Sequence, residues 1–258
     1  MSTGPATPEP FAHRLLEESR ELVDQAAAQG LAVRLMGGIG IRMVLGDRFP
    51  ERFARAYGDI DVLVGRRDSR GVEELLAARG WDPATAFNAL NGSRRLLFHD
   101  PASSAQVDVF VEAFEMCHAL PLADGLQRPG PTLPATDLLM SKLQIVSLNA
   151  KDRGDLYALL AGCDLRDGDH QAIEPDRLAA LSSRDWGLHH TFELNLARLR
   201  EGLAAGEAPP EVGPPIAAIA QAMEDTPKTR AWKLRARIGE RKRWYDDPEE
   251  VDRTTEAG

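Results

Sequence analysis

The stretch Leu31-Ala-Val-Arg-Leu-Met-Gly-Gly-Ile39 runs from a short apolar segment into two consecutive glycines. The apolar run 31–36 predicts a strand, and residues 39–46 return to the spacing of a helix. A turn at this place leaves free backbone N–H groups at the positive end of the helix dipole. Because glycine also lets a backbone approach a phosphate closely, Gly37 and Gly38 are candidate anion-binding residues. Taken alone, such a pair more often marks an ordinary turn.

The segment Asp59-Ile-Asp-Val-Leu-Val64 alternates polar and apolar residues, which predicts a strand. Side chains two residues apart on a strand point to the same face. Asp59 and Asp61 therefore share one face, while Ile60 and Val62 face a core on the other.

A third carboxylate lies in Gln106-Val-Asp-Val-Phe-Val111, which alternates in the same way and predicts another strand. A carboxylate between apolar strand neighbours is costly unless it is paired or bound to a metal. If the two strands are neighbours, Asp108 converges with Asp59 and Asp61. The alternative is that Asp108 only caps a helix or pairs with an arginine.

Grouped carboxylates suit Mg²⁺, with Mn²⁺ as an alternative, because these ions take oxygen ligands together with substrate phosphates and water. Two such ions about 3.5–4 Å apart would hold the attacking and leaving oxygens in line. Asp108 could also accept the proton of an attacking hydroxyl. Asp59, Asp61 and Asp108 are therefore the predicted metal ligands and catalytic residues of a phosphoryl-type transfer.

Composition limits the class of protein. Of 258 residues, 43% are hydrophobic and 28% charged, which is typical of a globular chain with a real core. No run approaches the roughly 20 apolar residues of a membrane helix, and the first ten residues do not have the pattern of a signal peptide. Two cysteines in unrelated contexts predict neither a disulfide framework nor a zinc site. We expect a cytoplasmic protein with no membrane contact; the net charge of −9 disfavours a general nucleic-acid-coating role.

The chain divides into two parts by its patterning. Residues 1–10 predict a disordered tail, and residues 11–128 alternate helices and strands, which predicts an α+β (or α/β) core around a small mixed sheet. A stretch rich in Pro and Gly follows from 121 to 134. Residues 129–245 predict an all-helical C-terminal domain, with helices near 137–148, 152–162, 175–182, 188–205, 214–224 and 228–242. Residues 246–258 predict a second tail.

Leu35-Met-Gly-Gly38, Asp59-Ile-Asp61 and Val107-Asp-Val109 together resemble the signature of the DNA polymerase β-like nucleotidyltransferases. The long spacing between the glycines and the acidic pair is similar to the abortive-infection (AbiEii-type) branch. The resemblance implies an NTP as co-substrate and a divalent ion as cofactor. Gly38 departs from the Ser that is common in the family, so backbone contacts would have to replace a side-chain contact to phosphate.

Further residues enter through this resemblance alone. Arg55 matches the arginine that often precedes the acidic pair in that branch. The segments Leu138–Val146 and Asn149–Tyr157 are similar to its helical motif, which borders the nucleotide. By position, Lys142 would meet the triphosphate, whereas Lys151, Asp152 and Asp155 would line or brace the site. Alternatively, Lys142 is only solvated and Asp152 only a favourable charge at a helix N-terminus.

The whole chain also looks like a group of actinobacterial-type nucleotidyltransferases, and Asp185-Trp-Gly-Leu188 and the segment 227–239 are typical of that group. That second segment is basic, through Lys228, Arg230, Lys233, Arg235 and Arg237. It would offer phosphate-binding contacts to a nucleic acid such as a tRNA. The competing interpretation is an amphipathic helix with a solvated basic face.

Two classes of function remain open from the sequence. The first is an enzyme that transfers a nucleoside monophosphate from an NTP to a hydroxyl or phosphate of a small molecule, a tRNA or a protein, with release of pyrophosphate. The second is a non-catalytic nucleotide-sensing or partner-binding module on the same fold. The presence of all three carboxylates disfavours the second class.

Overall fold

The structure is a computed structural model that describes residues 9–247, with side chains from Arg14 onward. The predicted tails, 1–10 and 246–258, lie mostly outside the described residues. At their inner ends the structure differs from the prediction, because Glu9 and Pro10 already belong to the first helix, and Asp246 donates its backbone N–H to the carbonyl oxygen of Cys117 at 3.0 Å.

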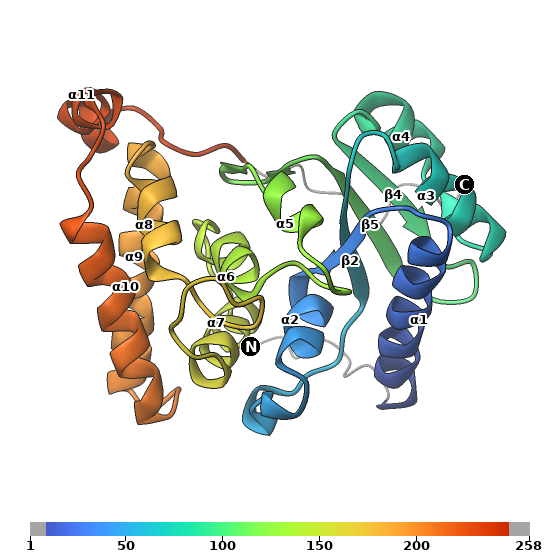
Figure 1. Ribbon diagram of the computed structural model, residues 1–258, viewed down its shortest axis with the longest axis horizontal. Coiled ribbons are helices and arrows are strands. Elements are labelled where there is room, and N and C mark those ends of the chain that lie inside the picture. Colours follow the sequence, from blue (N-terminus) through green and yellow to red (C-terminus); the bar gives the residue numbers. More distant parts are fainter. Residues whose placement is uncertain (1–8, 248–258) are drawn as a thin grey trace.

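The first half of the chain builds a sheet with helices on both sides (Figure 1). Its elements are α1 (Glu9–Ala28), β1 (Val33–Met36), α2 (Gly37–Leu45), the short 3-10 helices η1 (Gly46–Arg48) and η2 (Glu51–Phe53), β2 (Asp59–Val64), α3 (Ser69–Ala78), β3 (Asp82–Pro83), α4 (Thr85–Asn91), β4 (Arg95–His99) and β5 (Gln106–Val111). The strands lie in the order β1-β2-β5-β4-β3. β2 and β5 run parallel and the other neighbouring strands of this sheet are antiparallel, so the sheet is mixed as expected.

Alternation along the strands separates two cores, one on each face of the sheet. Ile60 and Val62 of β2 face a cluster that includes Leu15 and Leu22 of α1. Leu63 of the same strand belongs to the opposite cluster, which includes residues of α2 and of the helices of the second half. Figure 1 shows α1 and α2 on opposite sides of the strands. Burial of both faces fixes the register, because a slip by one residue would exchange the two faces.

The second half is helical, apart from a small hairpin at its start. Its elements are β6 (Phe114–Glu115), β7 (Ala119–Leu120), α5 (Ala123–Gln127), α6 (Ala135–Leu143), α7 (Ala150–Gly162), α8 (Pro175–Ser182), α9 (Trp186–Ala204), η3 (Pro210–Val212), α10 (Gly213–Asp225), α11 (Arg230–Ile238) and η4 (Gly239–Arg241). The expected architecture, a small mixed sheet with flanking helices followed by a helical region, is therefore confirmed. The domain boundary at residue 128 stays a prediction.

Local signals explain where the main helices begin. α7 opens with a capping box, in which the side chain of Asn149 accepts from the backbone of Asp152 and the Asp152 carboxylate accepts from the backbone of Asn149. Asp185 caps α9 by accepting from Leu188 N–H at 3.0 Å. Within residues 9–247, no helix combines the length and the apolar character needed to cross a bilayer.

Candidate functional site

Two carboxylates face each other across the parallel pair of strands. Asp61 of β2 and Asp108 of β5 are directly opposite in the register, and Asp59 is opposite Gln106. Asp59 and Asp61 share a face because they are two residues apart. The structure therefore brings the three predicted acidic residues together on one face of the sheet, near the N-terminal ends of β2 and β5, as expected if these strands are neighbours.

The three carboxylates line a cavity of about 420 Å³. Its polar wall includes Gly37, Asp59, Asp61, Arg95, Gln106, Asp108, Ser141, Lys142, Ser147, Asn149 and Asp152, and its apolar wall includes Met36, Phe110, Phe114, Met116, Cys117 and Ile145. A cavity of this size with a few converging polar groups is typical of a small-molecule site. The polar groups of the lining suit a charged ligand group, and its apolar side chains suit an apolar ring.

Gly37 is the first residue of α2 and lines this cavity, whereas its neighbour Gly38 does not. Its φ of +62° is a conformation that glycine adopts without strain. A Cβ atom at this position would lie 1.9 Å from Oδ2 of Asp61. Gly37 therefore serves two purposes: it starts the helix whose N-terminus borders the cavity, and it leaves room for the Asp61 carboxylate.

The surroundings of Asp61 are unfavourable for its charge. Burial of the carboxyl group, together with the nearby carboxylates of Asp108 and Asp59, raises its pKa to about 7. Carboxyl groups that lie this close together cannot all lose their protons at the usual pH, unless a nearby cation compensates the negative charge. A cation bound beside these carboxylates would reduce the repulsion between them, as the nearby charges of Lys142 and Arg95 already do in part.

Asp108 is held by Arg95, a residue that the sequence analysis did not single out. Both Nε and Nη2 of Arg95 lie 2.8 Å from Oδ1 of Asp108. The guanidinium also lies over the ring of Phe110, at 5.2 Å from its centroid. The pairing of Asp108 with an arginine, which the sequence left as the alternative, is thus present in the structure.

The donor set fits a hard divalent ion such as Mg²⁺ or Mn²⁺, because carboxylate oxygens are the ligands that these ions prefer. In the arrangement seen here, however, Asp108 binds Arg95, and Asp59 accepts from Gln106 Nε2 at 3.4 Å. Among the described residues, no three acidic, histidine or cysteine side chains are close enough together to form a metal site. The role of the trio as metal ligands stays a prediction.

Lys142 of α6 reaches the cavity from the helical half. Its Nζ lies 2.8 Å from Oδ1 of Asp152 and 3.1 Å from Oδ2 of Asp155. Burial acts to lower the pKa of Lys142, but the Asp155 and Asp152 carboxylates outweigh it and the pKa is raised. The lysine is therefore a fixed positive charge in the wall of the cavity. Asp152, the third residue of α7, accepts from the backbone N–H of Asn149 and also pairs with Lys142; its contact with a nucleotide stays a prediction.

Behind the cavity, Arg55 and Asp155 form a two-point ion pair, with Nη2–Oδ2 at 2.8 Å and Nε–Oδ1 at 3.2 Å. A Cβ on Gly38 would lie 2.3 Å from Nη2 of Arg55. A serine at position 38, which is common in the polymerase β-like family that the sequence resembles, would therefore displace this arginine. Gly38, Arg55, Lys151 and Asp155 are not in the lining of the cavity, and Lys151 is exposed. The structure indicates bracing for Arg55 and Asp155; direct contact of these four residues with a nucleotide stays a prediction.

The basic segment lies at the end of the molecule far from the sheet (Figure 1). Two of its five cations have structural partners: Lys228 Nζ donates to backbone carbonyls at the end of α10, and Arg235 donates to Gly239 O at 2.7 Å and Lys242 O at 2.8 Å. Arg230, Lys233 and Arg237 are exposed. Contact with a nucleic acid stays a prediction that concerns these three.

Comparisons with known proteins add little to this geometry. No protein-family model matches the chain, and no curated protein matches it. Among solved structures, the chain is similar to the solution structure of the antibiotic-resistance factor ANT(2'')-Ia, with 15% identity and a TM-score of 0.39, over 76% of this chain and 96% of that one. The two differ too much in sequence and in backbone for residue roles to be carried across.

Proposed function

We propose that the protein is a divalent-metal-dependent nucleotidyltransferase that moves a nucleoside monophosphate from an NTP to an acceptor hydroxyl. One observation carries this proposal: Asp61 and Asp108 face each other on parallel neighbouring strands, with Asp59 on the same face, beside the glycine-led N-terminus of α2. Carboxylates and an anion-binding helix end are the two components that phosphoryl-type transfer needs side by side.

The triphosphate would bind on the side of α2. Free backbone N–H groups at Gly37 and the following residues of the first turn favour phosphate oxygens. Lys142 adds a buried positive charge to the lining of the same cavity. The apolar wall, with Phe114, Met116 and Ile145, offers a surface for the nucleobase.

Asp59, Asp61 and Asp108 would hold the metal, which when bound neutralises charge on the triphosphate and on the departing pyrophosphate. Binding requires Asp108 to present an oxygen to that site. Nε and Nη2 of Arg95 both contact Oδ1 of Asp108 and keep the carboxylate in place. Oδ2 of Asp108 would then be the oxygen that binds the metal.

In the reaction, the acceptor oxygen forms a bond to the α-phosphorus while the bond between that phosphorus and the bridging oxygen to the β-phosphate breaks. Pyrophosphate leaves with the bridging oxygen. The hydroxyl proton passes to a carboxylate oxygen of Asp108, the acidic residue farthest along the sheet from α2. Positioning and charge stabilisation, rather than covalent chemistry by the protein, carry the rate.

A direct test is the release of labelled pyrophosphate from γ-labelled NTPs with Mg²⁺ and a pool of candidate acceptors, for the wild type and Asp61→Asn. We expect release that depends on acceptor and metal and falls at least about a hundredfold in the variant. Equal release of pyrophosphate by the variant and the wild type would show that Asp61 takes no part in the reaction. Nucleotide binding without any transfer, unaffected by Asp61→Asn, would favour the non-catalytic module instead.

A further inference from the structure

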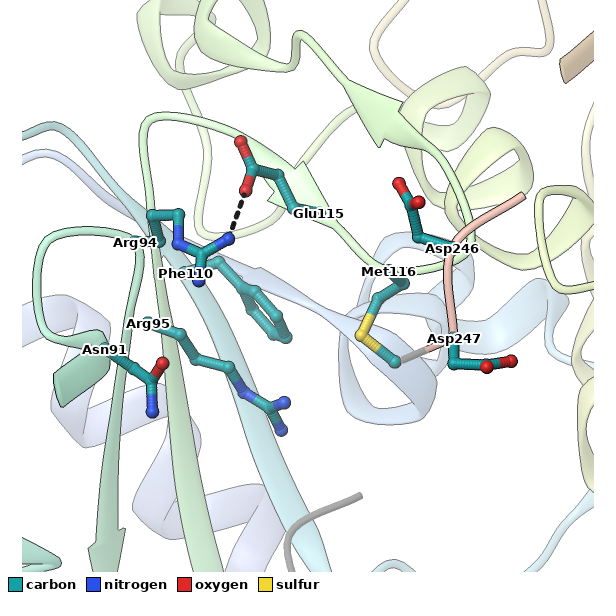
Figure 2. A pocket seen from close by; sticks show the side chains of 8 residues that line it. All are labelled: Asn91, Arg94, Arg95, Phe110, Glu115, Met116, Asp246 and Asp247. Atoms are coloured by element: carbon teal, nitrogen blue, oxygen red, sulfur yellow. Dashed lines mark hydrogen bonds and ion pairs between the residues drawn. The ribbon is translucent and has the colours of Figure 1, made fainter. Parts of the chain in front are cut away.

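A second cavity, of about 240 Å³, adjoins the first (Figure 2). Arg95, Phe110 and Met116 line both cavities, so the two meet at the guanidinium that holds Asp108. Elements distant in sequence line the second cavity: α4, β4, β5, the β6–β7 hairpin and Asp246 and Asp247, the last two described residues.

The order of the strands separates the two cavities along the sheet. Gly37 follows β1, Asp61 lies on β2, Asp108 on β5 and Arg95 on β4, and these strands are consecutive neighbours. The triphosphate side proposed above lies at the β1 end of this row. The second cavity lies at the β4 end, beyond Asp108. Asp108 itself lines only the first cavity, so a molecule in the second cavity would reach it past Arg95 and Phe110, which line both cavities.

Side chains of both charges line the second cavity: the guanidinium groups of Arg94 and Arg95, and the carboxylates of Glu115, Asp246 and Asp247. Figure 2 shows Arg94 and Arg95 on one side, Asp246 and Asp247 on the other, and Met116 between them. Nη1 of Arg94 lies 3.4 Å from Oε2 of Glu115. Asp247 forms an ion pair with Arg243, which does not line the cavity. Asp246 makes no ion pair with another described residue.

The acidic wall is anchored rather than loosely placed. Asp246 donates its backbone N–H to Cys117 O at 3.0 Å, and Trp244, two residues earlier, donates its indole N–H to Thr191 at 3.1 Å. The ring of Trp244 also packs against that of His190, with centroids 5.1 Å apart. A carboxylate held opposite a guanidinium in this way recognises a ligand that carries both charges.

We infer that this second cavity is the acceptor site and that it takes a small zwitterionic hydroxyl compound. Its anionic group would meet Arg94 and Arg95, its ammonium group would meet Asp246 and Asp247, and its hydroxyl would point toward Asp108. This inference rests on the proposed function: the hydroxyl oxygen bonds to the α-phosphorus of the NTP, pyrophosphate leaves, and the proton passes to Asp108. The volume of about 240 Å³ favours a small molecule over a polymer end.

The test uses L-serine as a zwitterionic probe, with N-acetyl-L-serine and L-serinamide as probes that keep only one charge. Binding to the full-length, metal-free protein is measured by calorimetry or by ligand-observed NMR, so the readout does not depend on activity. The variant Asp246→Asn, Asp247→Asn keeps the backbone anchor and removes the acidic wall. Glu211→Gln, an exposed carboxylate in η3, is the matched control. NTP binding with Mg²⁺ is measured on the same samples.

We expect L-serine to bind about tenfold more tightly than either single-charge probe, and the double variant to lose about tenfold in affinity while Glu211→Gln loses none. NTP binding should be the same in all three proteins. No preference for the zwitterion at millimolar concentration, in protein that binds NTP, would overturn the acceptor site and leave the proposed function intact. Serine binding in protein that binds no NTP would overturn the proposed function, and with it the acceptor role of the cavity.

Discussion

A Cβ atom on Gly37 would lie 1.9 Å from the Oδ2 atom of Asp61. No L side chain at residue 37 is compatible with the present position of that carboxylate, and the φ of +62° adds strain for any residue other than glycine. The glycine turn and the acidic strand are therefore one structural unit.

The first prediction follows from this contact. Gly37→Ala should displace Asp61 and reduce Mg²⁺-dependent NTP affinity by at least about tenfold, measured by calorimetry. Gly46→Ala is the matched control, because Gly46 also has a positive φ of +54°, but a Cβ atom there would meet no other atom within 4 Å. It should cost about 1 kcal/mol of stability through backbone strain and leave NTP affinity unchanged. Equal losses of affinity in both variants would mean that strain alone, and not the contact with Asp61, matters.

A second prediction concerns the ion pairs behind the cavity. Asp155 is buried and shared between Arg55 and Lys142, so Asp155→Asn leaves two partly buried cations short of a partner. We expect the free energy of unfolding to fall by about 3 kcal/mol, measured by urea denaturation. The exposed pair of Arg70 and Glu74 provides the comparison: Glu74→Gln should cost less than about 0.5 kcal/mol. A loss of the same small size for Asp155→Asn would show that the network does not brace the site.

A third prediction assigns Arg95 a positioning role. Arg95→Gln should lower kcat by about tenfold or more, because Asp108 loses both hydrogen bonds that hold Oδ1, while the KM for NTP changes little. Arg66→Gln removes a comparable but exposed ion pair, with Glu112, and should leave both constants as they are. A rise in KM at constant kcat would instead indicate that Arg95 contacts the nucleotide.

A fourth prediction is a pH dependence of stability. Burial raises the pKa of Asp137 on α6 to about 6. Nη2 of Arg177 lies 2.6 Å from Oδ1 of Asp137, and its positive charge acts to lower that pKa but does not outweigh burial. Because the folded state holds this proton more tightly than the unfolded chain does, the stability contributed by Asp137 is present below about pH 4 and is lost as the pH rises through about 6. Asp137→Asn, which mimics the protonated form, should gain about 2–3 kcal/mol relative to wild type between pH 4 and pH 7.

Urea denaturation of both proteins across that range measures the difference, and the exposed Asp164→Asn serves as the control. A difference between wild type and Asp137→Asn that stays constant from pH 4 to pH 7 would contradict this assignment.

The sequence predicted the acidic strands to the residue, because β2 and β5 alternate over six residues each with Val and Ile on one face. The same pattern predicted that Asp59 and Asp61 share a face. The direct opposition of Asp61 and Asp108 could not be predicted, since the pairing of strands 47 residues apart depends on tertiary packing. Helices α6 to α11 were predicted near the positions where they occur, but α6 ends at Leu143 rather than near residue 148, and the short helix α5 was not predicted.

Elements without an apolar pattern escaped prediction. α4 buries none of its residues, so it has no periodic signal, and β6 and β7 are two residues long each. α11 ends at Ile238 rather than near residue 242, because Gly239 takes a φ of +58° and stops the helix. Arg95 was missed for a related reason: its partner Asp108 lies on another strand, although an arginine at the start of an apolar strand near a predicted buried carboxylate is a usable signal.

We propose that the three carboxylates and the Gly37 turn form one metal-dependent nucleotide site. The measurement that tests it most directly is calorimetric titration of each NTP, with and without Mg²⁺, into the wild type and into Asp59→Ala, Asp61→Ala. We expect NTP binding that requires Mg²⁺ and is lost in a double variant that remains folded. Absence of binding by a folded wild type, or binding that neither the omission of Mg²⁺ nor the double variant changes, would contradict it.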